Sequence, residues 1–116
     1  PQSRDAERGV IGSVLRDNAA LNDVQNIIRV DNFYFDAHQK IFQAISDTYN
    51  QGKPVDLLIL HELLKQRKQL EDVGGAAYLA ELWDAAPTAA NAAYYAKIVR
   101  DKALVRNLIH TSTELL

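Results

Sequence analysis

The segment His61-Glu62-Leu63-Leu64-Lys65 comes closer to a catalytic motif than any other part of this sequence. Zinc proteases carry the helical pattern HExxH, in which two histidines one turn apart bind the metal and the glutamate acts as general base. Lys65 stands where the second histidine would be. Because a lysine ammonium group has no lone pair to give to a metal, the segment does not predict a zinc site.

The other two histidines, His38 and His110, have no histidine or cysteine at the spacing of a metal site. We expect each of them at a helix start or on a solvated face. The chain contains no cysteine, which excludes disulfides and thiolate metal sites. This composition is typical of a protein of the reducing cytosol, so we expect a cytoplasmic location.

Neither a nucleotide site nor a nucleophile is predicted. Gly74-Gly75 has neither the spacing of a dinucleotide-binding loop nor the Gly-Lys-Ser/Thr that completes a phosphate loop. No G-x-S-x-G elbow occurs, and the paired carboxylates Glu71-Asp72 fall in a predicted solvated turn. The sequence therefore predicts no catalytic residue, no cofactor and no metal in this chain.

The charge balance argues against strong binding to nucleic acid. Thirteen Lys and Arg residues against fifteen Asp and Glu residues leave a formal charge of −2, whereas nucleic-acid binders usually carry a basic excess. A basic stretch near the C-terminus supports the alternative of a small helical nucleic-acid-binding module, although a solvated helix face explains it better. The stretch consists of Lys97, Arg100, Lys102 and Arg106.

The chain has the size of a single domain. Its 116 residues are 47% apolar, enough for a hydrophobic core, and its apolar runs are too short to span a membrane. It starts at Pro1 without any methionine and stops at Glu114-Leu115-Leu116 within an amphipathic pattern. We therefore expect it to be a piece of a longer protein.

Apolar residues at spacings of three and four predict three helices in the first half of the chain. Ser3 is a candidate N-cap for the first, over about 4–16, and a short second helix reaches Asp31-Asn32. Asp36 is a candidate N-cap for the third, which Gly52 ends. Their apolar faces are Ala6, Val10, Ile11, Val14 and Leu15, then Leu21, Val24, Ile27 and Ile28, then Ile41, Phe42, Ile45 and Tyr49.

Three further helices are predicted in the second half. The apolar run 55–60 could be a strand, but Pro54 and the potential cap Asp56 precede it, and helical spacing continues to about Arg67. A fifth helix follows Gly74-Gly75, and a long sixth runs from about residue 91 to the end. The sequence predicts an all-α bundle of about six helices, with residues 1–90 as a globular part and 91–116 as a long helix.

Short motifs separate these helices in a characteristic order. They are Asp31-Asn32-Phe33-Tyr34, His38-Gln39-Lys40-Ile41-Phe42, Gly52-Lys53-Pro54-Val55-Asp56-Leu57, Gln69-Leu70-Glu71, Gly74-Gly75, Tyr78-Leu79 with Leu82, and Pro87-Thr88-Ala89-Ala90-Asn91. Together they resemble the N-terminal domain of the DnaB family of bacterial replicative DNA helicases. The opening, through Val10-Ile11-Gly12, is similar too, with Ile11 in place of the family's usual leucine.

This resemblance implies a division of labour within a longer protein. In the family, ATP and Mg²⁺ are bound by a separate C-terminal motor domain, whose motifs do not occur here. The last helix would lead into a helical hairpin, a linker and that motor. We therefore expect that the chain itself neither hydrolyses ATP nor unwinds DNA, and that its parent is an ATP-dependent helicase near the bacterial nucleoid.

The resemblance also implies partners. N-terminal domains of the family pair as a trimer of dimers in a collar on a hexameric ring and receive the C-terminal domain of primase. A helicase loader is a further candidate partner, and we expect at most weak direct contact with DNA. Candidate residues for self-association are Val105, Leu108, Ile109 and Leu116. Tyr78 is the candidate primase contact, with burial in the core as the alternative.

Overall fold

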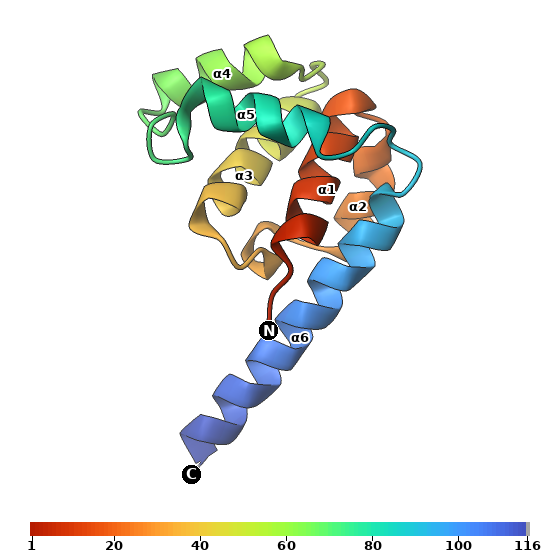
Figure 1. The fold of residues 1–116 in the computed structure, drawn as a ribbon, viewed down its shortest axis with the longest axis vertical. Helices are drawn as coiled ribbons and strands as arrows, with labels where there is room; N and C mark the ends of the chain where they lie inside the picture. Colours follow the sequence, from red (N-terminus) through yellow and green to blue (C-terminus); the bar gives the residue numbers. More distant parts are fainter. Residues whose placement is uncertain (116) are drawn as a thin grey trace.

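Six α-helices and one short 3-10 turn make up the computed structural model, which describes residues 1–115 (Figure 1). The helices are α1 (Arg4–Arg16), α2 (Ala20–Ile27), α3 (Asp36–Asn50), α4 (Leu57–Gln66), α5 (Gly75–Asp84) and α6 (Ala92–Leu115), and η1 (Val30–Asn32) is the 3-10 turn. The prediction of an all-α bundle of six helices with a long last one is confirmed. No helix within residues 1–115 is both long and apolar enough to cross a membrane.

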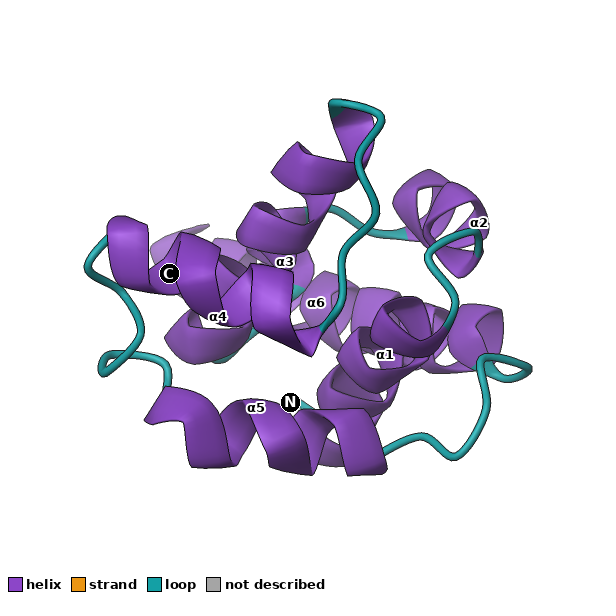
Figure 2. Ribbon diagram, turned by 90° about the horizontal axis from the view of Figure 1, so that it is seen from above, coloured by secondary structure: helices purple, strands orange, loops and turns teal. Residues whose placement is uncertain are grey.

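Helix α1 is the central element, and α2, α3, α5 and α6 all pack against it (Figures 1 and 2). The Ser3 side chain caps it by accepting a hydrogen bond from the Ala6 N–H at 3.2 Å, as predicted. Two glycines allow neighbouring helices to approach closely. A Cβ atom on Gly9 would lie 2.7 Å from the Tyr95 ring, and one on Gly12 would lie 2.4 Å from the Leu82 carbonyl oxygen.

Two predicted helix ends in the first half of the chain are wrong. Helix α2 ends at Ile27, and the chain then forms the turn η1, whose Asn32 side chain accepts the Arg29 N–H at 2.8 Å. Asp36 is not the N-cap of α3 but its first residue, where it pairs with Lys40 at 2.9 Å. The N-cap is Phe35, whose backbone N–H is satisfied by a carboxylate from α1 rather than by a local side chain.

The run after Pro54 is helical, so the choice of helix over strand is confirmed. Asp56 caps α4 by accepting the Ile59 N–H at 2.9 Å. Leu60 and Leu64 point into the core, whereas Leu58 is 70% exposed.

The two halves of α6 have different environments. Ala92, Ala96, Val99 and Ala103 are buried on the side of α6 that faces the other helices. The second half projects away from the other helices (Figure 1). Arg106 lies at the border, where its guanidinium group donates hydrogen bonds to the carbonyl oxygens of Pro1 and Asn32, each at 2.8 Å.

Candidate interaction surfaces

A cleft of about 480 Å³ opens beside Tyr78, between α5 and the start of α3. Its apolar lining comes from Phe35, Val73 and Ala77, and the Tyr78 ring forms part of its wall. Tyr78 is half-buried, between the two environments considered for it from the sequence. Charged side chains surround the cleft: Arg4, Asp36, Glu71, Asp72 and Glu81.

Glu7, His38 and Tyr78 form a chain of hydrogen bonds that ends at the Tyr78 hydroxyl, and we call these three side chains the row. His38 Nε2 lies 2.6 Å from Tyr78 Oη, and His38 Nδ1 lies 2.8 Å from Glu7 Oε1. The imidazole and phenol rings are stacked, with centroids 5.9 Å apart and 10° between their planes. Three helices, α1, α3 and α5, therefore each supply one side chain to this row.

Both inner members of the row are removed from solvent. His38 is 0% exposed and Glu7 is 2% exposed. The expectation of a solvated face for His38 is thus wrong, although His38 does lie in the first turn of α3. Glu7 also accepts the backbone N–H groups of Tyr34 at 2.9 Å and Phe35 at 3.4 Å, which compensates the burial of its charge.

The charges around the cleft are partly paired. Lys40 lies 2.9 Å from the Asp36 carboxylate and 3.5 Å from that of Asp72, and the hydrogen bond with Asp36 raises the pKa of Lys40 above 10.5. Burial raises the pKa of the Tyr78 hydroxyl above 10.0, while the positive charges of Arg8 and Arg4 oppose that shift. Tyr78 is therefore a neutral phenol at physiological pH.

An apolar stripe runs along α6 on both sides of Arg106. Its members follow the i, i+1, i+4, i+5 spacing of one helix face, and all are exposed. The exposed fractions are 53% for Leu104, 43% for Val105, 67% for Leu108 and 53% for Ile109. We call these four residues the α6 stripe. Sequence reasoning missed Leu104, because periodicity alone cannot show where a helix leaves its globule. Leu116, also predicted for this surface, lies outside the described residues.

The structure does not bring Tyr78 and the α6 stripe together. Helix α5 lies at the end of the molecule opposite the projecting half of α6 (Figure 1). They are two separate surfaces, and each can contact a different partner.

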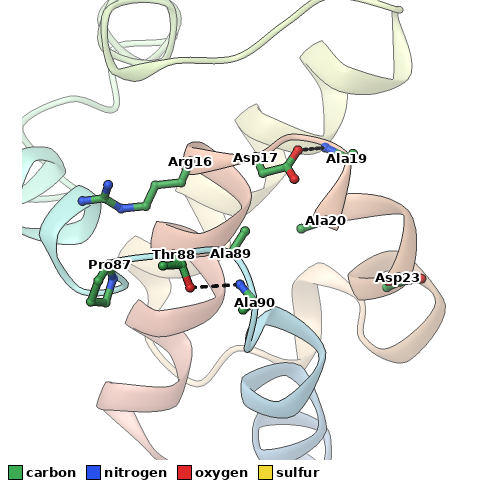
Figure 3. Close-up of a pocket in the computed structure, with 9 residues that line it drawn as sticks. All are labelled: Arg16, Asp17, Ala19, Ala20, Asp23, Pro87, Thr88, Ala89 and Ala90. Carbon is green, nitrogen blue, oxygen red and sulfur yellow. Dashed lines mark hydrogen bonds between the residues drawn. The ribbon is translucent and has the colours of Figure 1, made fainter.

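A larger cleft, of about 620 Å³, lies where α1 and α2 meet the loop before α6 (Figure 3). Three of the polar side chains that line it are hydrogen-bonded to backbone groups of the same chain. Asp17 accepts the Ala19 N–H at 3.0 Å, and Thr88 accepts the Ala90 N–H at 3.2 Å. Arg16 points away towards α5, where its Nε donates to the Trp83 carbonyl oxygen at 3.1 Å. These local bonds give the cleft little with which to select a ligand.

The structure shows where the candidate metal ligands and the basic stretch of α6 lie. Within residues 1–115, no three His, Asp or Glu side chains gather where one metal ion could bind them. Of the basic residues on α6, Arg106 is bound to two carbonyl oxygens and Arg100 lies 3.2 Å from Asp101. The basic stretch therefore does not form one continuous free surface.

Comparison with known proteins identifies the family. The family model described as DnaB-like helicase N terminal domain matches residues 1–101. Proteins named Replicative DNA helicase DnaB are 48% identical in Geobacillus stearothermophilus and 43% identical in Pasteurella multocida (strain Pm70), each over 115 residues, 99% of this chain and 25% of the relative. The chain thus spans about a quarter of the length of these relatives.

A solved structure agrees with this match. The crystal structure of the N-terminal domain of DnaB helicase from Mycobacterium tuberculosis superposes with a TM-score of 0.96 at 43% sequence identity, covering 98% of this chain and 79% of that chain. The matched family model, the matched sequences and this fold all agree. The chain belongs to the family of DnaB-like helicase N-terminal domains.

Proposed function

We propose that this chain serves assembly and recruitment in a bacterial replicative DNA helicase. The α6 stripe pairs copies of the domain within a hexameric collar arranged as a trimer of dimers. The Tyr78 cleft receives the C-terminal domain of primase. ATP-dependent unwinding belongs to a motor domain outside this chain, in keeping with the quarter of the relatives' length that the chain matches.

The observation that carries the assembly proposal is the α6 stripe. Four neighbouring aliphatic side chains exposed on one face of a projecting helix form an apolar patch of a kind that usually marks an interface. A second copy of the same helix offers the same face, so two stripes can pack against each other about a twofold axis. Residues beyond Leu116 would enlarge the contact towards the roughly 1,000 Å² that a specific interface needs.

Sedimentation velocity of the full-length protein tests this proposal. Replacing Leu108 and Ile109 together by aspartate places charges in the apolar contact, so the hexamer should dissociate into smaller species. Leu58→Asp is the matched control, because Leu58 is also well exposed but lies on α4. An unchanged hexamer in the double variant, with a normal circular dichroism spectrum, would refute the role of the stripe.

Calorimetry with the C-terminal domain of the cognate primase tests recruitment. Saturable binding to the full-length protein should weaken by about tenfold or more in Tyr78→Ala, because a half-buried aromatic residue is a common interface anchor. Tyr94→Ala is the control, since Tyr94 is 64% exposed on α6. Absence of heat with a folded hexamer would refute recruitment and leave assembly as the proposed role.

A further inference from the structure

The row Glu7–His38–Tyr78 has a direction that follows from its donors and acceptors. The Glu7 carboxylate faces the N–H groups of Tyr34 and Phe35 as well as His38 Nδ1. An ionised carboxylate accepts hydrogen bonds and donates none, so Nδ1 carries the hydrogen that it shares with Glu7. In a neutral imidazole the other nitrogen, Nε2, is then a bare acceptor.

The order of donors and acceptors in the row decides which atoms of the Tyr78 hydroxyl face the cleft. Tyr78 Oη lies 2.6 Å from that bare Nε2, so the hydroxyl hydrogen points inwards to His38. A phenol that donates inwards presents its oxygen lone pairs and its ring face to the cleft, where a hydrogen bond from the Arg4 side chain also acts on the oxygen. The positive charges of Arg4 and Arg8 already act on this hydroxyl, which is consistent with an oxygen placed to receive donors.

We propose that Glu7 and His38 are positioning residues that hold Tyr78 as a hydrogen-bond acceptor, so that the cleft selects a protein partner through a donor group, a backbone N–H or a Lys or Arg side chain. This inference rests on the proposed docking of a partner at the Tyr78 cleft. It adds the chemical character of the contact and the two buried residues that determine it.

The tautomer of His38 can be read directly by ¹⁵N nuclear magnetic resonance on the 116-residue chain at neutral pH, with no partner present. We expect Nδ1 to be protonated and Nε2 to be bare. A bare Nδ1 with a protonated Nε2 would overturn the proposal, because Tyr78 would then donate outwards.

Calorimetry at neutral pH tests the consequence for binding, with the full-length protein and the primase C-terminal domain as probe. Tyr78→Phe keeps the ring but lacks the hydroxyl, so its affinity should be lower by about two- to tenfold, the range expected for one hydrogen bond. Tyr94→Phe should behave like the wild type.

The outcomes separate this inference from the proposed function. No binding at any pH refutes docking at the cleft, and the inference falls with it. Binding by Tyr78→Phe with the wild-type affinity, or a bare Nδ1 on His38, refutes the positioning role alone.

Discussion

Gly12 allows α1 and α5 to approach closely because it has no side chain. A Cβ atom there would lie 2.4 Å from the Leu82 carbonyl oxygen, a backbone atom that can move only if α1 and α5 separate. We expect Gly12→Ala to lower the free energy of unfolding by about 3 kcal/mol, as overpacking of a tight interface does. Urea denaturation followed by circular dichroism measures this loss.

Gly52→Ala is the control for that experiment. Gly52 has a φ of +78°, and a Cβ atom added there would meet no other atom within 4 Å, so only backbone strain of about 1 kcal/mol is expected. A loss at Gly12 no larger than the loss at Gly52 would contradict the close approach of α1 and α5.

Tyr78 predicts a dependence of stability on pH. Because burial raises its pKa above 10.0, the folded protein keeps the phenol proton where the unfolded chain has lost it. The stability contributed by neutral Tyr78 is present below about pH 10 and is lost as pH rises through the raised pKa. Denaturation at stepped pH values should show a steeper decline above about pH 10 for the wild type than for Tyr78→Phe. Parallel curves for the two proteins would contradict burial of the hydroxyl.

Among the helices, α4 depends on a single cap. Asp56 accepts the Ile59 N–H at 2.9 Å, and its carboxylate also lies at the positive end of the helix dipole. Asp56→Ala should lower the free energy of unfolding by about 1 kcal/mol. Glu62→Ala, an exposed change later in the same helix, should stay within about 0.5 kcal/mol of the wild type. Equal losses in thermal unfolding would argue against the cap.

Helix α6 is held by Arg106, which lies beyond the middle of its 24 residues. The guanidinium group ties it to Pro1 and Asn32 and lies 5.3 Å from the Tyr34 ring centroid. Arg106→Ala should speed hydrogen exchange of the α6 amides after residue 106, since that half has no buried residue among those described. Lys102→Ala, a neighbouring exposed change, should leave exchange unaltered. Mass spectrometry of peptides from α6 would detect equal protection in the Arg106 variant, which would refute the tether.

The elements also show what a sequence can predict. Ser3 and Asp56 were predictable as caps because each acts within three residues of its own position. Asp36 was misassigned because the Phe35 N–H before α3 is satisfied by Glu7, 28 residues earlier in the chain. The burial of His38 was not predicted for the same reason, since its partners lie 31 and 40 residues away. Local spacing reports which face of a helix is buried but not which polar groups meet there.

For the whole molecule, the charge distribution predicts weak binding to DNA. The net charge is −2, and Arg100 and Arg106 on α6 already have partners. Fluorescence anisotropy with single-stranded DNA should therefore give only weak binding to this chain at physiological salt. Tight binding with a steep salt dependence would instead support the alternative of a nucleic-acid-binding module.

Because α6 is one continuous helix, the hydrogen bonds from Arg106 to Pro1 and Asn32 fix the direction in which its end projects. The stretch from Arg106 to Thr113 spans about 10 Å, at about 1.5 Å per residue. A change of about 10° in that direction would therefore move Thr113 sideways by about 2 Å relative to Arg106. Under the proposed pairing through the α6 stripe, small changes around Pro1 and Asn32 would alter the angle between paired copies.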